Sequence, residues 1–395
     1  MSPLVIVGSG LAGYTLAREF RKLDPTTPLV IVTRDDGRAY AKPVLSNALA
    51  AGRDPAQIAS ADAPAMAAQL NASVRCGVQV NAIDRTRGLL LTDQGEIAYG
   101  RLVLAHGADP IALALGGDAA AAVMSVNDLA DYTRFRAALP ANGRVVLLGA
   151  GLIGCEFAND LLAAGHSVNV VDPAPLPLGR LLPAGVAQAY RDRLAAAGVQ
   201  WRLGTVAERV DRVSGGASDS ASGGASDGAL RVTLADGAAL AADVVLSAVG
   251  LRPRIALAAQ AGLAVARGVV VDRHLRTSDP QIFALGDCAE VDGQLLPYVM
   301  PLMQGARALA ATLAGQPTPV TYPAMPVSVK TPAAPLVVAP PPPGIEGQWQ
   351  IDSRNDGFEA QFVDPQGVLR GFALLGDSTS QRMGFARRMP AVFAT

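Results

Sequence analysis

The stretch "VIVGSGLAG" at residues 5–13 decides the fold, because "LLGAGLIGCE" at residues 147–156 nearly repeats it. Each stretch places a Gly-x-Gly-x-x-Gly turn between an apolar run and a helical pattern. In such a turn the first glycine allows a sharp bend, the second lets the backbone approach a pyrophosphate, and the third packs the helix onto the strand. One copy is weak evidence, but two copies in this context predict two bound dinucleotides. The glycines are Gly8, Gly10 and Gly13, and then Gly149, Gly151 and Gly154.

The segments around both turns have the pattern of α/β units. Strands are expected at 4–7 and 28–33 around the first turn, and at 145–148 and 167–172 around the second. After the first turn, Leu16, Phe20 and Leu23 recur at helical spacing and are expected to face inward, with charged residues between them. Each unit therefore reads as strand, turn, helix and parallel strand.

Composition excludes several classes of protein. The 395 residues carry a net charge of −1 and are half hydrophobic, so neither a nucleic-acid footprint nor an acidic tail is present. No run approaches the length of a membrane span, and the first strand begins at Leu4, so we expect a soluble cytoplasmic protein without a signal peptide. Cys76, Cys155 and Cys288 are scattered, as are the three histidines, which predicts packing roles for the cysteines and no metal site.

The order of the strands predicts that one module is inserted into another. The strand at 102–105 ends at His106-Gly107, and the strand at 244–247 ends in the same way at Val249-Gly250. The stretch that follows, "GVVVDRHLRTSDPQIFALGDCAEV", resumes the first pattern. We expect an α/β fold of two nested Rossmann-like domains: 1–107 with 251–319, the inserted 108–250, and a small α+β domain at 320–395.

Two segments have biased composition. Residues 214–228, "SGGASDSASGGASDG", offer little to bury and are expected to form a flexible hairpin loop. Proline becomes frequent from Gln316 onward, and "APPPPG" at 339–344 reads as a stiff connector. Strands are expected in "MPVSVK", "PLVVA", "QWQID", "FEAQFVD" and "LRGFALLG", followed by a helix through "TSQRMGFARRM".

Over its whole length the chain resembles the glutathione-reductase-like family of FAD- and NAD(P)H-dependent pyridine nucleotide reductases. The strand ending in Gly-Asp within "TSDPQIFALGDCAEV" matches the second FAD motif of that family. Four stretches are most similar to those of its rubredoxin-reducing members: "YAKPVLS" (40–46), "GAGLIGCEFAND" (149–160), "LPYVMPLMQGARALAATLAG" (296–315) and "MPVSVKTP" (325–332).

The resemblance implies which residues hold each cofactor. The first glycine turn would bind the pyrophosphate of FAD and the second that of the nicotinamide cofactor, each at a helix N-terminus. Asp287 would hold a ribityl hydroxyl. Arg34 stands where many relatives have an acid, so Asp35 is the candidate for the FAD adenosine ribose. His106 replaces a common threonine and is interpreted as packing beside the cofactor. Further FAD contacts are implied at Ser9, Leu11, Val80 and Val299.

The residue that ends the second strand of the inserted module indicates the nicotinamide cofactor. Asp172 lies 23 residues after Gly149, where a carboxylate can bind two ribose hydroxyls and repel a 2′-phosphate. The next arginine is Arg180. This pattern favours NADH over NADPH, although Asp172 can also be a turn residue that ends the strand.

Three charged residues are expected beside the flavin. The resemblance places Lys42 next to the ring, with Glu156 reaching it from the other side, and a Lys42–Glu156 pair is predicted to gate the nicotinamide. Lys330 in "SVKTP" is the third, close to where reduction leaves negative charge, and a helix opening near Pro301 would add its dipole. The alternative is that these are a solvated loop lysine, a glutamate at a helix start and a solvated strand-end lysine.

The route by which electrons leave follows from missing cysteines. Disulfide reductases of this family keep a cysteine pair against the flavin, and oxidases keep one cysteine near position 42, where this chain reads "AYAKPVLSN". Electrons are therefore expected to pass directly to an external carrier, and rubredoxin is the carrier that the resemblance implies. Flavorubredoxin or ferredoxin, or a non-catalytic FAD-binding signalling protein, are the alternatives. Candidates for a basic docking rim are Arg382, Arg387, Arg388 and Lys330.

Overall fold

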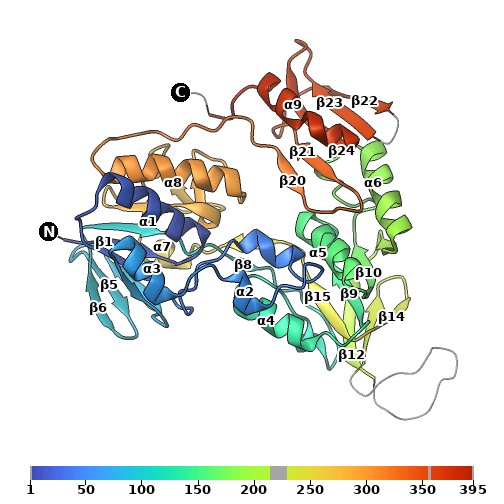
Figure 1. Cartoon of the computed structure of the whole chain (residues 1–395), viewed down its shortest axis with the longest axis horizontal. Coiled ribbons are helices and arrows are strands. Elements are labelled where there is room, and N and C mark those ends of the chain that lie inside the picture. Colours follow the sequence, from blue (N-terminus) through green and yellow to red (C-terminus); the bar gives the residue numbers. More distant parts are fainter. Residues whose placement is uncertain (1, 214–228, 355–356, 394–395) are drawn as a thin grey trace.

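The computed structural model describes residues 2–213, 229–354 and 357–393. Figure 1 shows three parts: a first α/β module that contains the N-terminus, a second α/β module in the middle of the chain, and a C-terminal sheet with one helix. Within the described residues, no helix is both long enough and apolar enough to cross a membrane.

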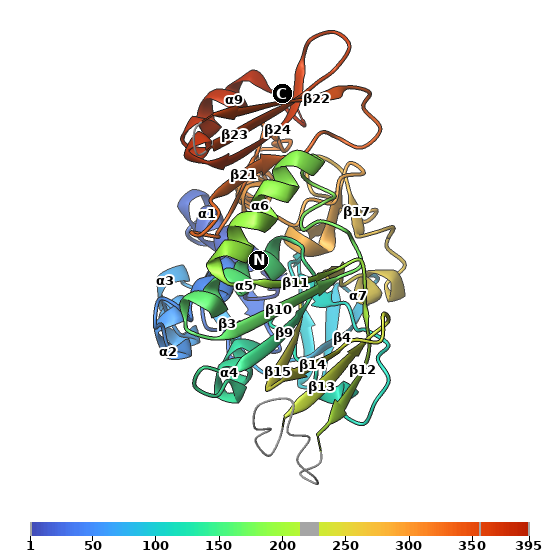
Figure 2. The same cartoon turned by 90° about the vertical axis from the view of Figure 1, so that its right-hand side faces the viewer.

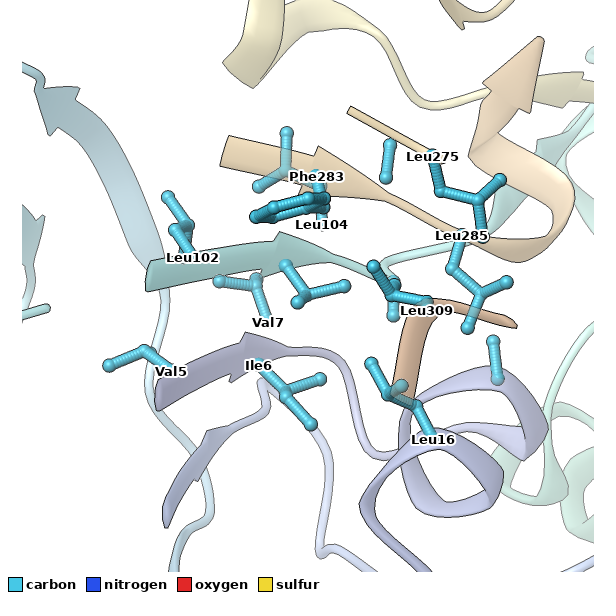
Figure 3. Close-up of a cluster of buried hydrophobic side chains, with 14 of the residues drawn as sticks. Val5, Ile6, Val7, Leu16, Leu102, Leu104, Leu275, Phe283, Leu285 and Leu309 are labelled. Carbon is cyan, nitrogen blue, oxygen red and sulfur yellow. The ribbon is translucent and has the colours of Figure 1, made fainter. Parts of the chain in front are cut away.

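A five-stranded parallel sheet forms the centre of the first module, in the order β18-β7-β1-β2-β3. Its inner strands are nearly all apolar, as expected for a sheet buried on both faces. Figure 3 shows how side chains such as Ile6, Leu16 and Leu309 meet between the sheet and the helices. The strands are β1 (Leu4–Val7), β2 (Leu29–Val32), β3 (Ser73–Arg75), β7 (Arg101–Leu104) and β18 (Ile282–Ala284), and the main helices are α1 (Leu11–Leu23), α3 (Ala63–Leu70) and α8 (Val299–Leu313).

The chain leaves this sheet after β7 and returns to it at β18, which pairs directly with β7. Two short antiparallel strands, β8 (Ala108–Pro110) and β16 (Leu251–Pro253), pair where the chain leaves and re-enters. This strand order agrees with an inserted second module, while the domain boundaries given above stay a prediction.

The second module has a parallel sheet in the order β11-β10-β9-β15 beside an antiparallel sheet, β12-β13-β14. Its β10 covers the predicted strand 167–172. The strands are β9 (Arg144–Leu148), β10 (Ser167–Asp172), β11 (Gln200–Leu203), β12 (Ala207–Arg212), β13 (Leu230–Leu234), β14 (Ala239–Ala242) and β15 (Val244–Ser247), and the helices are α4 (Leu129–Ala138), α5 (Leu152–Ala163) and α6 (Ala184–Ala197). The segment predicted as a flexible hairpin loop, 214–228, lies outside the described residues.

Short elements complete the first module. They are β4 (Val80–Asp84), β5 (Leu89–Thr92), β6 (Gly95–Ala98), β17 (Val269–Val271), β19 (Ala289–Val291), α2 (Pro55–Ile58), α7 (Ala256–Gln260) and the 3-10 turns η1 (Lys42–Asn47) and η3 (Gly286–Cys288). A further 3-10 turn, η2 (Ala120–Ala122), belongs to the second module. The turns η1 and η3 matter most here because they carry two of the predicted site residues, Lys42 and Asp287.

The C-terminal domain is a five-stranded antiparallel sheet in the order β20-β21-β24-β23-β22. One face packs on α9 through Phe385, and the other face shares a core with Tyr190 of α6 (Figure 2). The predicted strands and helix are all present: β20 (Val327–Val329), β21 (Leu336–Ala339), β22 (Gln348–Arg354), β23 (Gly357–Val363), β24 (Leu369–Gly376), η4 (Asp377–Gln381) and α9 (Arg382–Arg388).

One sequence-based prediction of the fold is wrong, and another agrees with the structure. The prolines at 340–343, predicted to be part of a stiff connector, join β21 to β22 of one sheet, where residues without an N–H end the strand. Leu23 is not inward-facing: it is 50% exposed, because α1 ends at this residue and the chain turns away at Asp24.

Candidate functional site

The two glycine turns have the same geometry. Gly8 has φ +115° and Gly149 has φ +107°, a region that favours glycine. A Cβ atom on Gly8 would lie 2.4 Å from the carbonyl oxygen of Ala105, and one on Gly149 would lie 2.7 Å from that of Ala248. In both modules the first glycine is therefore needed so that the turn can pack against the neighbouring strand end.

The other glycines of each turn divide into one that is packed and one that is open. A Cβ atom on Gly13 or Gly154 would lie 1.9 or 2.0 Å from the carbonyl oxygen of the first glycine of its own turn, so these residues are required by packing. At Gly10 and Gly151 a Cβ atom would meet nothing within 4 Å. The backbone at the second glycine is thus open on its outer side, which fits the close approach of a pyrophosphate.

The helices that follow the turns begin without a side-chain cap. Gly10 and Gly151 are the N-cap residues of α1 and α5, and neither helix has an acidic residue in its first turn. By contrast, α3 and α4 are capped by Asp62 and Asp128. The first N–H groups of α1 and α5 are therefore left for another acceptor, and an anionic phosphate suits them.

In the second module, an aspartate at the end of the adjacent strand holds the glycine turn through hydrogen bonds. Asp172 of β10 accepts hydrogen bonds from the backbone N–H groups of Ala150 at 2.7 Å and Ala174 at 2.8 Å. The carboxylate is thus fixed beside the glycine turn, where a ribose would follow a pyrophosphate. This position fits both the predicted role in NADH binding and the alternative role as a turn residue.

The corresponding aspartate of the first module is held by hydroxyl groups. Oδ1 of Asp35 accepts from Ser9 Oγ at 2.9 Å, from Thr33 Oγ1 at 2.7 Å and from the backbone N–H of Gly37 at 2.9 Å. Arg34, the residue that departs from the pattern, is exposed and lies 3.8 Å from Asp109. The assignment of Asp35 to the FAD ribose stays a prediction.

Lys42, at the start of η1, meets residues from two other segments. Its Nζ donates to Oδ1 of Asn127 at 2.6 Å and lies 3.9 Å from Oδ2 of Asp287 in η3. Burial lowers the pKa of Lys42, and Asp287 opposes this shift. The structure therefore brings together two predicted flavin contacts, Lys42 and Asp287, and adds Asn127, which no sequence motif indicated.

Glu156, in the first turns of α5, is buried and pairs with Lys330. It accepts from Oγ of Ser46 at 2.6 Å, from the backbone N–H of Lys330 at 3.0 Å and from Nζ of Lys330 at 3.1 Å. Nζ of Lys330 also donates to the carbonyl oxygen of Pro43 at 2.8 Å. The predicted Lys42–Glu156 pair is thus wrong, because the turn after β20 brings Lys330 onto Glu156 while Lys42 points to Asn127 and Asp287.

The start of α8 lies beside η3. Pro301 and Leu302 line the same small pocket as Gly286 of η3. The N-cap residue of α8, Tyr298, has no side-chain cap, and the first turn has no acidic residue. An uncapped helix N-terminus, with its partial positive charge, therefore lies beside η3, the turn that carries Asp287.

The remaining predicted cofactor contacts are spread along the first module. Leu11 is the half-buried first residue of α1, Val80 is buried in β4, and Val299 is 41% exposed at the start of α8. These three contacts stay predictions.

His106, which follows β7 and Ala105, is held as a neutral side chain. Its Nε2 lies 2.9 Å from the carbonyl oxygen of Arg254, which can only accept, so Nε2 carries the proton. Burial lowers the pKa of His106 to about 4. A base in the neutral pH range would need a higher pKa, so the interpretation of His106 as packing beside the cofactor is consistent with its surroundings.

The three cysteines lie in surroundings of different exposure. Cys155 and Cys288 are buried, Cys76 is half-buried, and all three are free thiols.

The four predicted rim residues do not lie together. Lys330 points to α5, whereas Arg382, Arg387 and Arg388 lie on α9, which covers the opposite face of the C-terminal sheet (Figure 1). The predicted basic rim of four residues is therefore not one continuous surface. No cluster of His, Cys, Asp and Glu suited to a metal is found among the described residues.

Sequence reasoning missed the groups that hold the predicted residues in place. Asn127 binds Lys42, Ser46 binds Glu156, and two further residues of α5, Asn159 and Asp160, bind backbone N–H groups of neighbouring segments. Ser46 and the α5 residues lie within the quoted stretches, but their partners are distant in sequence, so spacing alone could not have found these contacts.

Comparison with known proteins agrees with this geometry. Residues 2–310 match the family described as pyridine nucleotide-disulphide oxidoreductase, and residues 319–389 match the rubredoxin binding C-terminal domain. Rubredoxin-NAD(+) reductase of Acinetobacter baylyi is 49% identical over 99% of this chain and 98% of its own length. The protein of the same name from Alcanivorax borkumensis is 47% identical over 99% and 100%.

Solved structures show the same architecture. Putidaredoxin reductase, in its covalent complex with putidaredoxin, is 27% identical and covers 98% of this chain and 94% of its own, with a TM-score of 0.86. Matches of this extent, together with the paired glycine turns, establish that the chain belongs to the pyridine nucleotide-disulphide oxidoreductase family and ends in a domain of the rubredoxin-binding type.

Proposed function

We propose that the protein is an NADH-dependent rubredoxin reductase, an NADH:rubredoxin oxidoreductase that uses FAD. One observation carries the proposal: the match to the oxidoreductase family runs to residue 310 and is followed by the rubredoxin-binding domain at 319–389, whose Lys330 pairs with Glu156 of the second module. The names of the two close relatives support the same activity.

The described residues divide the work of binding between the two modules. Bound FAD accepts a hydride from NADH and releases electrons singly. The open backbone at Gly10 and the uncapped start of α1 fit the pyrophosphate of FAD, and Gly151 with α5 fits that of NADH. Asp287 would bind a ribityl hydroxyl, and Lys42, 3.9 Å away, would lie beside the flavin.

The charges around this position fit an electron-accepting ring. Lys330 and the uncapped start of α8 supply positive charge, and Glu156 fixes Lys330 through its ammonium and its backbone N–H. Positive charge placed in advance stabilises negative charge that develops during reduction. We assign Lys330 and α8 this role, and we assign Lys42 and Glu156 the role of ordering the loop between flavin and nicotinamide.

The distribution of cysteines supports direct transfer to a carrier. The 42–47 turn contains no cysteine, and Cys155 and Cys288 are buried and free. Burial raises the pKa of the Cys155 thiol to about 12 and that of Cys288 to about 11, so neither is a ready thiolate nucleophile. The chain thus offers no disulfide relay, and an external one-electron acceptor such as rubredoxin fits this site.

We also propose a setting for the enzyme. Reduced rubredoxin would supply an alkane hydroxylase system, and the enzyme would work in the cytoplasm, where its free thiols are stable. Flavorubredoxin or ferredoxin as the physiological acceptor, and a non-catalytic signalling role, are the outcomes that the following experiment separates.

The test is NADH-dependent reduction of cytochrome c by the FAD-loaded protein, with and without a panel of purified rubredoxins, flavorubredoxins and ferredoxins. We expect rubredoxins to give the greatest stimulation. If every ferredoxin outpaced every rubredoxin, the assigned acceptor would be wrong. If NADH failed to bleach the flavin within seconds, the protein would not be a reductase at all.

A further inference from the structure

One buried face of α5 carries three polar side chains. Glu156, Asn159 and Asp160 are spaced at i, i+3 and i+4, so they lie on the same side of the helix. All three are buried. Buried polar groups are costly unless they are hydrogen-bonded, and here each accepts a hydrogen bond from a segment outside the second module.

Asp160 holds the segment that follows Lys42. Its Oδ2 accepts from the backbone N–H of Leu49 at 3.0 Å, and its Oδ1 accepts from that of Ala50 at 3.0 Å. These residues directly follow η1, which carries Lys42 and Ser46. Burial raises the pKa of Asp160, and the two N–H groups oppose the shift. Each oxygen has its own donor, so an amide side chain could replace only one of the two contacts.

Asn159 holds the turn that carries Lys330. Its Oδ1 accepts from the backbone N–H of Ala333 at 3.1 Å. The same turn is bound at Thr331, whose Oγ1 lies 3.3 Å from the buried hydroxyl of Tyr190 on α6. The C-terminal domain therefore presents Lys330 in a turn that is fixed by side chains of the second module.

We propose that Asn159 and Asp160 are positioning residues of the reductase: Asp160 fixes the loop of Lys42 through Leu49 and Ala50, and Asn159 fixes the turn of Lys330 through Ala333. The proposal rests on the proposed function, because that function places Lys42 and Lys330 beside the flavin. It adds that α5, whose first turn would face the nicotinamide cofactor, also sets the position of both lysines.

The second module contains a matched control. Asp243 also accepts a backbone N–H, that of Arg144 at 2.8 Å, together with the guanidinium of the same residue. Arg144 begins β9, so this contact lies at the end of the sheet opposite the glycine turn. Asp243→Asn weakens a comparable carboxylate contact without touching either loop.

Hydrogen–deuterium exchange reads the positioning directly, in the protein with and without FAD. Losing the side-chain acceptor of a backbone N–H typically weakens the local structure enough to change its opening about tenfold. We expect Asp160→Asn to accelerate exchange about tenfold at 49–50, Asn159→Leu to do so at 333, and Asp243→Asn to change neither. Unchanged exchange at 49–50 and 333 in folded variants would overturn the proposal.

Single-turnover reduction of the flavin by NADH tests the consequence for the reaction. For Asp160→Asn and Asn159→Leu we expect the limiting rate constant to fall about tenfold, while the NADH concentration that gives half the maximal rate stays unchanged. A merely structural role would leave the limiting rate constant at the value of Asp243→Asn, and this result would overturn the proposal. A wild-type flavin that NADH did not reduce would refute the proposed function instead, and the exchange data would then still decide whether the two residues fix the loops.

Discussion

Replacing Lys330 by methionine removes one charge from a pair that joins two domains. Nζ of Lys330 lies 3.1 Å from Oε2 of Glu156, whose side chain is only 6% exposed. Glu156 would keep its hydrogen bonds from Ser46 and from the backbone of residue 330, but it would lose its one ammonium donor. We expect Lys330→Met to slow hydride transfer to FAD, because a buried carboxylate is then left partly uncompensated.

The size of the coupling follows from distance and exposure. Two charges about 4 Å apart near a protein surface interact by about 4 kcal/mol before desolvation and screening are counted. Because the Lys330 side chain is 40% exposed, water screens much of this energy. We therefore expect a coupling of about 1–2 kcal/mol between Lys330→Met and Glu156→Gln, or about 5- to 30-fold in the rate constant.

The assay is a double-mutant cycle on the rate of flavin reduction by NADH in a single turnover, since steady-state rates can be limited by the acceptor. The double variant should recover part of the rate lost in Lys330→Met. A cycle of Lys42→Met with Glu156→Gln is the control, and it should give a coupling below about 0.5 kcal/mol, because Lys42 contacts Asn127 and Asp287 instead. Additive effects at Lys330 together with coupling at Lys42 would refute the pairing described above.

Three further predictions follow from the cofactor sites. Gly10→Ala should leave the stability of the FAD-free protein unchanged yet weaken FAD binding at least about tenfold. Gly8→Ala should destabilise the protein itself, because a Cβ atom meets the backbone at Gly8 but not at Gly10. Calorimetry and FAD titration check this prediction, and two variants that behaved alike would contradict it. NADH should exceed NADPH in kcat/KM by at least about tenfold, and Asp172→Ala should narrow the gap; equal efficiencies in the wild type would contradict this. Folding lowers the pKa of His106 from 6.5 to about 4, so the unfolded chain binds a proton more readily. The free energy of unfolding should therefore drop by about 1.4 kcal/mol per pH unit as the pH falls between these values. Urea titrations should show a smaller dependence of this free energy on pH for His106→Gln, and an identical dependence would argue against the burial of a neutral ring.

Local sequence patterns predicted most of the fold. The glycine turns were predictable because contacts within one strand, turn and helix determine their spacing. The structure shows the same packing at Gly13 and Gly154. The C-terminal strands were predictable from their alternation and from the turns between them. The proline run was predicted to be a stiff connector from its composition, which does not indicate the two strands that it joins, β21 and β22.

The contacts within the candidate site were less accessible to sequence reasoning. The resemblance indicated Lys42, Glu156 and Lys330, but their pairing depends on how the C-terminal sheet sits on α5 and α6. Hydrogen bonds such as Lys42 to Asn127 join residues 85 positions apart. The periodicity of a sequence does not indicate such a contact, because each partner considered alone has the pattern of a loop residue or a helix cap.

The central claim is that electrons pass from NADH through FAD to rubredoxin one at a time. Double-mixing stopped flow tests it most directly: the FAD-loaded protein is reduced anaerobically with a limiting amount of NADH and then mixed with excess oxidised rubredoxin or, in parallel, ferredoxin. The account predicts that two rubredoxins are reduced for each NADH consumed, and that rubredoxin reoxidises the flavin faster than ferredoxin does. A flavin that NADH reduces but that rubredoxin reoxidises no faster than ferredoxin would contradict it.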